Sequence, residues 1–471
     1  MWMVVAAMSS LAGCDVEVAD TSVESAQGPG RVLDDALKLS GSAAGELAGV
    51  AVAGRFDWNG DGQPDVAVGA TLADTTSALA GRACLFLGPI LSDRVLDDAD
   101  LCLVGVTENH LFGRDTEGLA DLDGDGFDEL GLGAVHDHTG SPTSGMVMVV
   151  WGGSPLDQPE TSIVHGVDAG GHLGLSIAPV PGPEPLFAAG AHGTVLNAES
   201  GCELRGEGIA WVVSPPERDA VVAVDEVGVP YRGERAGDRA GVSVLSPGDI
   251  DGDGLADLLI GASHARRAED GPQVGAVYLV QAPFQVGQVG RSVADADGVL
   301  FGQSDRGWFG WATAVVGDVD GDGLADLATS AFADSTNGTD AGAVYVYLGT
   351  SLTPSGAGLP LGTLLGEVAG DKAGEVLSQV GDLDGDGQAE LVVAAPTASH
   401  RRTWGGALYV IRGPVEGTRV LDDQDDLWVG TQDLQFLGAS VAPAGESTLI
   451  VGAVGDTTNT GAAFVLGGLL P

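Results

Sequence analysis

The sequence predicts an all-β chain folded as a seven-bladed β-propeller, in which four-stranded antiparallel blades surround a central axis. Glycine is very frequent, with 76 residues, whereas aromatic residues make up only 5%. That composition is typical of many short strands joined by tight turns. A unit of about 60 to 70 residues also recurs along the chain, and related phrases stand near both of its ends. Composition, repeat and matching ends together predict the fold class.

The repeat is visible in five acidic stretches, whose first aspartates are Asp57, Asp121, Asp249, Asp318 and Asp382. They lie 64, 128, 69 and 64 residues apart, and because 128 is twice 64, one copy has lost its acidic stretch. That copy is "LGLSIAPVPGPEPLFAAGA" (173–191), which aligns with "AGVSVLSPGDIDGDGLADLLIGA" (240–262). A further shortened copy, "LGASVAPAGESTLIVGA" (437–453), brings the total to seven.

Each unit predicts four strands in a fixed order. A first strand such as "AGVSVL" precedes the acidic stretch, and a second such as "DLLIGA" follows it. A third, such as "GAVYVYLG", comes after a surface connection, and a weaker fourth ends in glycine, as in "LCLVG" and "DLWVG". Four short strands per unit are expected to form one antiparallel blade.

The two ends of the chain predict how the ring closes. The phrase "RVLDDALKLSG" (31–41) precedes the first unit and nearly repeats "RVLDDADLCLVG" (94–105) and "RVLDDQDDLWVG" (419–430), whereas the last unit ends after its third strand. We therefore expect residues 31–41 to supply the outer fourth strand of the C-terminal blade, which removes exposed strand edges. An open solenoid is the structural alternative, but it needs capping units and the sequence shows none.

The N-terminal segment predicts export. Residues 1–13 are expected to be a signal peptide and residues 14–30 a flexible linker, which leaves residues 31–471 for the propeller. The apolar run ends in Leu11-Ala12-Gly13-Cys14, which resembles a bacterial lipobox, where cleavage precedes the cysteine and its thiol is acylated. No Lys or Arg precedes this run, a departure that a start codon further upstream would explain. An ordinary secretory signal is the alternative, so the expected location is the bacterial cell envelope, lipid-anchored, or outside the cell.

Charge and cysteine content narrow the function classes. The net charge of −47 argues against nucleic acid and anionic membranes, so membrane contact is expected only through an N-terminal lipid on Cys14. No run of 18 apolar residues is present, which excludes a polytopic membrane protein.

In an oxidising compartment Cys84 and Cys102, in neighbouring strand patterns, are candidates for a disulfide; two separate buried thiols are the alternative. Cys202 has no assigned role.

The acidic stretches predict calcium sites. Crowded carboxylates repel one another unless a cation lies between them, and Ca²⁺ takes six to eight oxygen ligands. Carboxylates at positions 1, 3 and 5 of a tight turn point inward, glycine at position 6 permits the turn, and an acid at position 9 closes the shell. An EF-hand closes at position 12 between helices, whereas β-type residues follow here. About five Ca²⁺ ions are expected, on Asp57, Asn59, Asp61 and Asp65; Asp121, Asp123, Asp125 and Glu129; Asp249, Asp251, Asp253 and Asp257; Asp318, Asp320, Asp322 and Asp326; and Asp382, Asp384, Asp386 and Glu390.

Three kinds of phrase carry a family resemblance. The first strands contain "LFG" (111–113), "WFG" (308–310) and "FLG" (436–438), the acidic loops span nine residues, and "GA" or "AAP" follows the second strand. Residues 31–471 in this way resemble the FG-GAP repeats of the integrin α-subunit propeller and its bacterial relatives. The resemblance implies calcium on hairpins of one face and ligand contacts on the opposite face. Two repeats lack the acidic loop and are expected to bind no metal.

The connections between second and third strands are the expected ligand face, because functional residues concentrate in loops. Two of them carry matching basic groups, which make a candidate cationic site for an acidic sugar or a protein carboxylate: His264, Arg266, Arg267, His400, Arg401 and Arg402. Ordinary solvated loop charges are the alternative. Two other connections contain His136 and His138, a weak metal signal, and His192.

These features predict a non-enzymatic, calcium-binding, extracytoplasmic lipoprotein, expected to be monomeric, that presents one loop face to a protein or glycan in adhesion or recognition. No catalytic residue can be assigned, since the hydrolase and nucleotide-binding motifs lack a supporting context in this sequence. A propeller scaffold of a polysaccharide lyase or hydrolase is one alternative. A purely architectural envelope protein is another.

Overall fold

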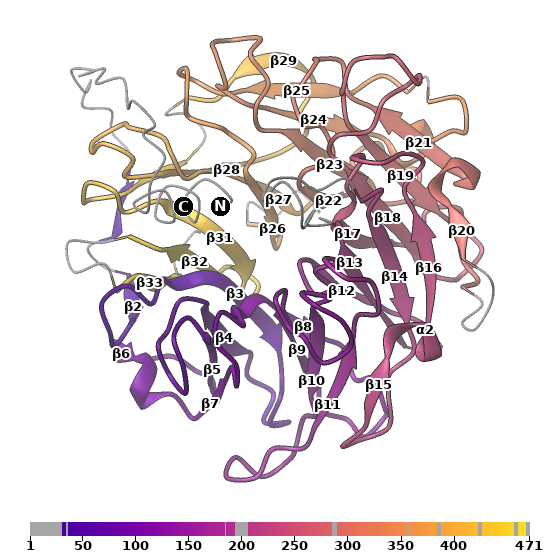
Figure 1. Cartoon of the computed structure of the whole chain (residues 1–471). Helices are drawn as coiled ribbons and strands as arrows, with labels where there is room; N and C mark the ends of the chain where they lie inside the picture. Colours follow the sequence, from indigo (N-terminus) through magenta and orange to yellow (C-terminus); the bar gives the residue numbers. More distant parts are fainter. Residues whose placement is uncertain are drawn as a thin grey trace, which may run out of the picture.

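The computed structural model describes residues 31–33, 36–183, 185–193, 206–284, 290–356, 358–383, 388–422, 426–455 and 460–467. Seven sheets surround one axis, and Figure 1 shows them as a ring. Within the described ranges, helix is confined to short turns: α2 (Val224–Val227), η3 (Leu96–Asp98), η4 (Val293–Asp295) and η5 (Gly349–Ser351). The all-β, seven-bladed fold class is confirmed.

Each blade begins with a strand at the axis. Blades one to seven, numbered in chain order, start with β3 (Ala48–Phe56), β8 (Phe112–Leu119), β12 (Ile177–Val180), β17 (Ala240–Gly248), β22 (Thr313–Gly317), β26 (Val376–Val380) and β31 (Leu437–Pro443). These strands contact one another around the centre (Figure 1). They therefore line the axial channel.

The second and third strands form the buried body of each blade. The second strands are β4 (Asp65–Ala70), β9 (Glu129–Ala134), β13 (Leu186–Ala191), β18 (Asp257–Ala262), β23 (Asp326–Ala331), β27 (Glu390–Ala395) and β32 (Leu449–Ala453). The third strands are β5 (Arg82–Phe86), β10 (Met146–Val150), β14 (Ile209–Val213), β19 (Ala276–Val280), β24 (Ala343–Tyr347), β28 (Ala407–Ile411) and β33 (Ala462–Leu466). Packing between blades covers both faces of these strands, so their apolar residues run almost without interruption.

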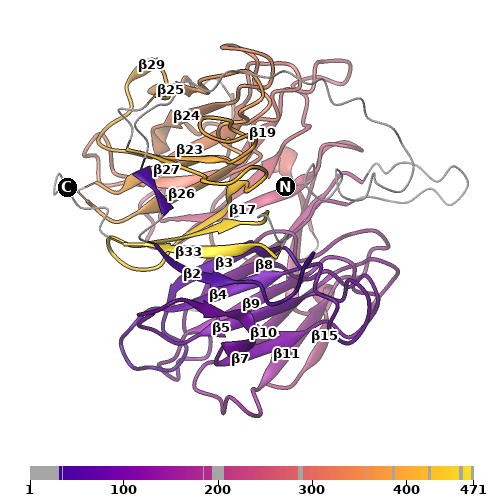
Figure 2. The same ribbon diagram turned by 90° about the vertical axis from the view of Figure 1, so that its left-hand side faces the viewer.

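The ring closes as the sequence predicts. The fourth strands of blades one to six are β7 (Leu101–Val104), β11 (Thr161–His165), β16 (Gly228–Arg232), β21 (Gly298–Phe301), β25 (Gly362–Leu365) and β30 (Leu427–Val429). In blade seven this place belongs to β2 (Leu37–Ser40), which pairs antiparallel with β33, Leu37 opposite Val465. Figures 1 and 2 show the indigo β2 beside the yellow β33. The strand β2, near the start of the described chain, thus completes the last blade.

One expectation about the closing phrase needs correction. Residues 31–41 do not form a single outer strand: β1 (Arg31–Val32) pairs in parallel with β30 of blade six, and only then does the chain enter β2. Four other connections likewise add a parallel edge strand to the preceding blade: β6 (Arg94–Val95), β15 (Val221–Ala223), β20 (Arg291–Ser292) and β29 (Gly417–Val420). Five sheets therefore have five strands. The added strand covers backbone donors and acceptors that the outer edge would otherwise expose.

A close glycine contact between neighbouring blades explains two recurrent phrases. A Cβ on Gly190, at the end of β13, would lie 2.0 Å from the carbonyl oxygen of Gly241 in the next blade. Gly241 has φ +80°, and its own Cβ would lie 2.4 Å from the carbonyl oxygen of Ile209. The same contact joins Gly69 to Gly113, Gly133 to Gly174, Gly261 to Gly310 and Gly452 to Gly49. The glycine of an "FG" phrase in one blade thus packs against the glycine of a "GA" phrase in the preceding blade, and neither position has room for a side chain.

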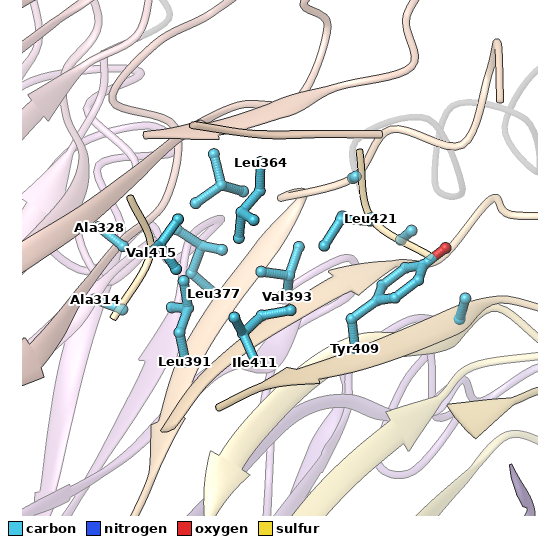
Figure 3. Packing of buried hydrophobic residues seen from close by; sticks show 14 of the residues in the cluster. Ala314, Ala328, Leu364, Leu377, Leu391, Val393, Tyr409, Ile411, Val415 and Leu421 are labelled. Carbon is cyan, nitrogen blue, oxygen red and sulfur yellow. The ribbon is translucent and has the colours of Figure 1, made fainter. Parts of the chain in front are cut away.

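Apolar side chains fill the space between blades. Figure 3 shows the cluster between blades five and six, in which Leu364, Leu377 and Val393 meet side chains of Ile411 and Val415. Leu421, just after the edge strand β29, is fully buried in the same cluster. The connection that supplies the edge strand therefore also packs into the core.

Candidate functional site

The acidic loops all lie at one end of the blades, because each joins an innermost strand to the second strand of its blade. They connect β3 to β4, β8 to β9, β17 to β18, β22 to β23 and β26 to β27. Asp384 and Asp386 lie outside the described residues, as does Cys14. The corresponding turns of blades three and seven run between β12 and β13 and between β31 and β32 without this acidic pattern.

The first aspartate of a loop shapes its backbone. In blade four, Asp249 Oδ1 accepts hydrogen bonds from the amides of Gly252 at 2.6 Å and Asp253 at 3.1 Å, and its Oδ2 accepts one from Gly254 at 2.8 Å. Asp121 and Asp318 accept the same three kinds of bond in blades two and five. These bonds fold the loop around its carboxylates, as short Asx turns do.

The acid at position 9 is buried and ties the loop to the blade. Asp257 accepts hydrogen bonds from the amides of Ile250 at 3.0 Å and Ala282 at 2.9 Å, so it joins the loop to the end of β19. Burial raises the pKa of Asp257 to about 6 and that of Glu129 to about 8. A nearby cation would oppose that effect and favour the charged carboxylates.

Three loops bring ligand oxygens together. One carboxylate oxygen from each member of a group lies within 4.8 Å of the others, and the groups are Asp121, Asp123 and Asp125; Asp249, Asp251 and Asp257; and Asp318, Asp320 and Asp326. All donors are oxygens, which suit a hard divalent cation. In blade one, the amide of Asn59 instead donates to Asp61 Oδ2 at 3.1 Å. In blade six, Glu390 accepts from the amide of Leu383 at 2.6 Å, as the acid at position 9 does elsewhere.

An arginine that sequence reasoning missed lies over the loop of blade two. Arg218 Nη2 is 2.6 Å from Asp123 Oδ2 and 2.5 Å from Asp125 Oδ2, and Nη1 is 2.7 Å from Glu160 Oε2. Its guanidinium also lies 5.2 Å above the ring of Trp151. Arg218 is 95 residues from Asp123 in sequence, so no local spacing indicates the contact.

The opposite ends of the innermost strands form the rim of the channel. The channel has a volume of about 590 Å³ and is lined by charged and aromatic side chains that include Arg114, Arg239, His192, Trp311 and Glu375. The second strands also end here, which brings the connections that follow them to the same face. The acidic loops and the rim are therefore at opposite ends of the propeller.

The predicted basic groups lie in blades four and six, separated by blade five. His264 Nδ1 is 3.0 Å from Ser263 Oγ and its ring is 5.2 Å from Trp308. The guanidinium of Arg267 instead lies 5.0 Å over Phe301 of the outer strand β21. The backbone carbonyl of Arg266 accepts a hydrogen bond from Arg235 at 3.1 Å. Within blade four, His264 is thus near the rim and Arg267 near the outer edge.

In blade six, His400 Nε2 is 2.8 Å from Tyr409 Oη and 3.6 Å from Glu367 Oε2. Arg401 and Arg402 are exposed. In blade two, His138 is also exposed, and its Nδ1 accepts a hydrogen bond from the amide of Thr143 at 3.1 Å. A ligand role for these residues stays a prediction.

Two further sequence expectations concern cysteines and membrane spans. Cys84 on β5 and Cys102 on β7 are opposite each other in register, and their sulfurs are bonded at 1.96 Å. Cys202 is outside the described residues. In the part of the chain that the structure describes, no helix has the length and apolar character to cross a bilayer.

Comparison with known proteins agrees with this architecture. The family model "FG-GAP repeat" matches residues 241–280, 309–347 and 377–411. A Drosophila melanogaster integrin alpha-PS2 is 36% identical over 125 residues, covering 26% of this chain and 8% of the integrin. Human integrin alpha-X is 33% identical over 215 residues, covering 44% of this chain and 16% of the integrin. The chain is a seven-bladed β-propeller that contains FG-GAP repeats, and parts of it are similar to integrin α subunits.

Other similarities are partial. A rat phosphatidylinositol-glycan-specific phospholipase D is 31% identical over 226 residues, covering 44% of this chain and 26% of the phospholipase. The chain thus spans about a quarter or less of the length of each of these three relatives. A crystal structure of BBS1N in complex with ARL6DN, soaked with mercury, covers 93% of this chain and 97% of its own, with 10% identity and a TM-score of 0.43.

Proposed function

We propose that the protein is a calcium-binding, non-enzymatic recognition module of the bacterial cell envelope, anchored through a lipid on Cys14. The observation that carries the calcium part is the convergence of carboxylate oxygens in three loops of one face. Bound Ca²⁺ would supply charge neutralisation and hold the hairpins rigid. Similarity to integrins supports a role in recognition, and we assign the ligand to the face opposite the acidic loops, because functional residues concentrate in loops.

Calorimetric titration with Ca²⁺ tests the metal sites. Asp249→Asn removes the charge of the residue that organises the blade-four loop, and we expect it to lower the number of bound ions by one or weaken that site at least tenfold. Glu446→Gln is the matched control, because Glu446 lies in the blade-seven turn, which lacks the acidic pattern. Equal titrations for both variants and the parent protein would refute the assignment.

The recognition role needs a separate experiment. A glycan array and a pull-down from envelope extracts, both with calcium present, are expected to identify a ligand that a chelator releases. A purely architectural protein would retain no specific ligand in either assay.

Globomycin treatment of the producing bacterium tests the anchor, because it blocks lipoprotein signal cleavage and should leave the precursor uncleaved.

A hydrolase scaffold is the second candidate, favoured by the partial similarity to the phospholipase D. Phosphodiesterase and glycosidase assays on any ligand that is recovered test it. Turnover that survives purification to homogeneity would replace the non-enzymatic assignment.

A further inference from the structure

The rim of the axial channel is chemically uneven around the ring. Seven residues in equivalent places, two before the recurring glycine at or just before each first strand, all adopt positive φ between 52° and 60°. In blades seven, one and two they are apolar: Phe436, Leu47 and Leu111. In blades three to six they are His172, Arg239, Trp308 and Lys372. Polar and aromatic side chains therefore gather on one arc of the rim, opposite an apolar arc.

A buried histidine adjoins this arc. His192 is only 3% exposed, and among the residues that the structure describes neither of its ring nitrogens has a hydrogen-bond partner. Its ring is 5.4 Å from that of His172, which is 5.3 Å from that of His136. Leaving a buried polar group unpaired is costly. The position indicates a place where a ligand supplies the missing partner.

The histidines of this arc do not form a metal-binding cluster within the described residues. Within the described ranges, the groups of side chains whose ligand atoms come close enough to share one ion all belong to the acidic loops. Burial lowers the pKa of His192, and the neighbouring His172, Arg239 and Arg114 lower it further. Both arginines line the channel together with His192, as do the carboxylates of Asp115, Glu117 and Glu375. Arg114 and Arg239 are therefore the groups that would attract an anion to this part of the channel.

An aromatic surface adjoins the basic group. The ring of Trp308 lies 5.2 Å from His264 and 6.0 Å from Trp311, and Phe332 packs edge-on against both tryptophans. Trp311 donates a hydrogen bond from Nε1 to the carbonyl oxygen of Glu375 at 3.1 Å, which fixes its ring at the channel. Both tryptophans are partly exposed. They offer an apolar face of the kind on which sugar rings stack, whereas a simple anion needs no such surface.

We propose that the rim between blades two and five binds a carboxylated sugar, whose ring packs on Trp308 and Trp311 and whose carboxylate meets Arg114, Arg239 and His192. The inference rests on the recognition function proposed above and names its ligand class. The channel volume of about 590 Å³ is within the range of small-molecule sites. An acidic peptide would use the arginines but leave the paired tryptophans without a role.

Titration with glucuronate, followed by tryptophan fluorescence and calorimetry in calcium, tests the proposal. Glucose is the neutral match, and inorganic phosphate and a tetraglutamate peptide are the other anions. We expect glucuronate to bind at least tenfold more tightly than any of the three. Arg239→Gln is expected to weaken glucuronate binding at least tenfold, and Trp311→Phe several-fold. Arg291→Gln removes the same charge from the exposed outer edge strand β20, and should change nothing.

Other results would overturn the proposal. If glucose binds as tightly as glucuronate, the carboxylate has no role in recognition. If phosphate or tetraglutamate binds as tightly as glucuronate, the sugar ring has no role. Equal effects of Arg239→Gln and Arg291→Gln, or no glucuronate binding by a parent protein that unfolds cooperatively, would remove the site. A ligand found on the array whose binding ignores Arg239 and Trp311 would leave the recognition function standing and refute this site alone.

Discussion

Single acidic residues have two distinct roles in the loops. The aspartate at position 1 folds the loop through backbone amides, whereas the acid at position 9 is buried and reaches the third strand. The spacing of the acids predicted both sets of residues, because the ligand positions are local in sequence. Arg218 and the unpaired His192 could not be predicted in this way, since their surroundings come from different blades.

Arg218 is expected to compete with a metal in blade two, because its guanidinium occupies oxygens of Asp123 and Asp125. Arg218→Gln should strengthen calcium binding at this site by about 0.5–1 kcal/mol, the scale of an exposed ion pair. Calorimetry in low salt measures the change. Arg232→Gln, which removes an arginine with longer contacts of 3.5 and 3.9 Å, is the control. Weaker binding in Arg218→Gln would show that the arginine supports the site.

His264 is expected to make stability depend on pH. Burial, with the charges of Arg239 and Arg266, lowers the pKa of His264 to about 3. Because the unfolded chain then binds the proton more tightly, this residue's contribution is lost as the pH falls from about 6.5 toward 3. Urea unfolding at pH 7, 6, 5 and 4 should show a shallower loss for His264→Gln than for the parent protein. Parallel curves would contradict the shift.

Between elements, the decisive contacts are those that join one blade to the next. The sequence predicted four strands per blade from the phrases that recur in each unit, and these strands are present. It did not predict the parallel edge strands, because two residues such as Arg94 and Val95 carry no periodic signal. The phrase at 31–41 was assigned to one strand for the same reason. Its division between blades six and seven depends on tertiary pairing.

The glycine contact between blades gives a prediction for Gly241. Gly241→Ala places a Cβ 2.4 Å from the carbonyl oxygen of Ile209 at φ +80°. Gly237→Ala, in the same blade, has φ +90° but meets nothing within 4 Å, so it carries only the backbone cost. We expect Gly241→Ala to lose about 1–3 kcal/mol more unfolding free energy than Gly237→Ala, measured by urea unfolding. Equal losses would show that close approach of the backbones is unimportant.

At the scale of the whole molecule, the matching phrases near the two ends of the chain predicted that the ring of blades closes. Leu39 on β2 is fully buried in the cluster between the last blade and the first, and β2 covers the edge of β33. A chain beginning at residue 41 should therefore expose that edge, melt at a lower temperature and associate. A chain beginning at residue 31 keeps β1 and β2 and is the control. Light scattering and thermal unfolding compare them; identical behaviour would contradict closure by β2.

Thermal unfolding in calcium and in excess chelator tests the central claim, that divalent ions neutralise the crowded acids of this propeller. A site filled at about 100 times its dissociation constant adds about 2.7 kcal/mol to the stability of the folded state. We predict a clear fall in melting temperature on chelation, reversed by added Ca²⁺, with a smaller fall for Asp249→Asn. A melting temperature that is the same in calcium and in chelator would contradict the account.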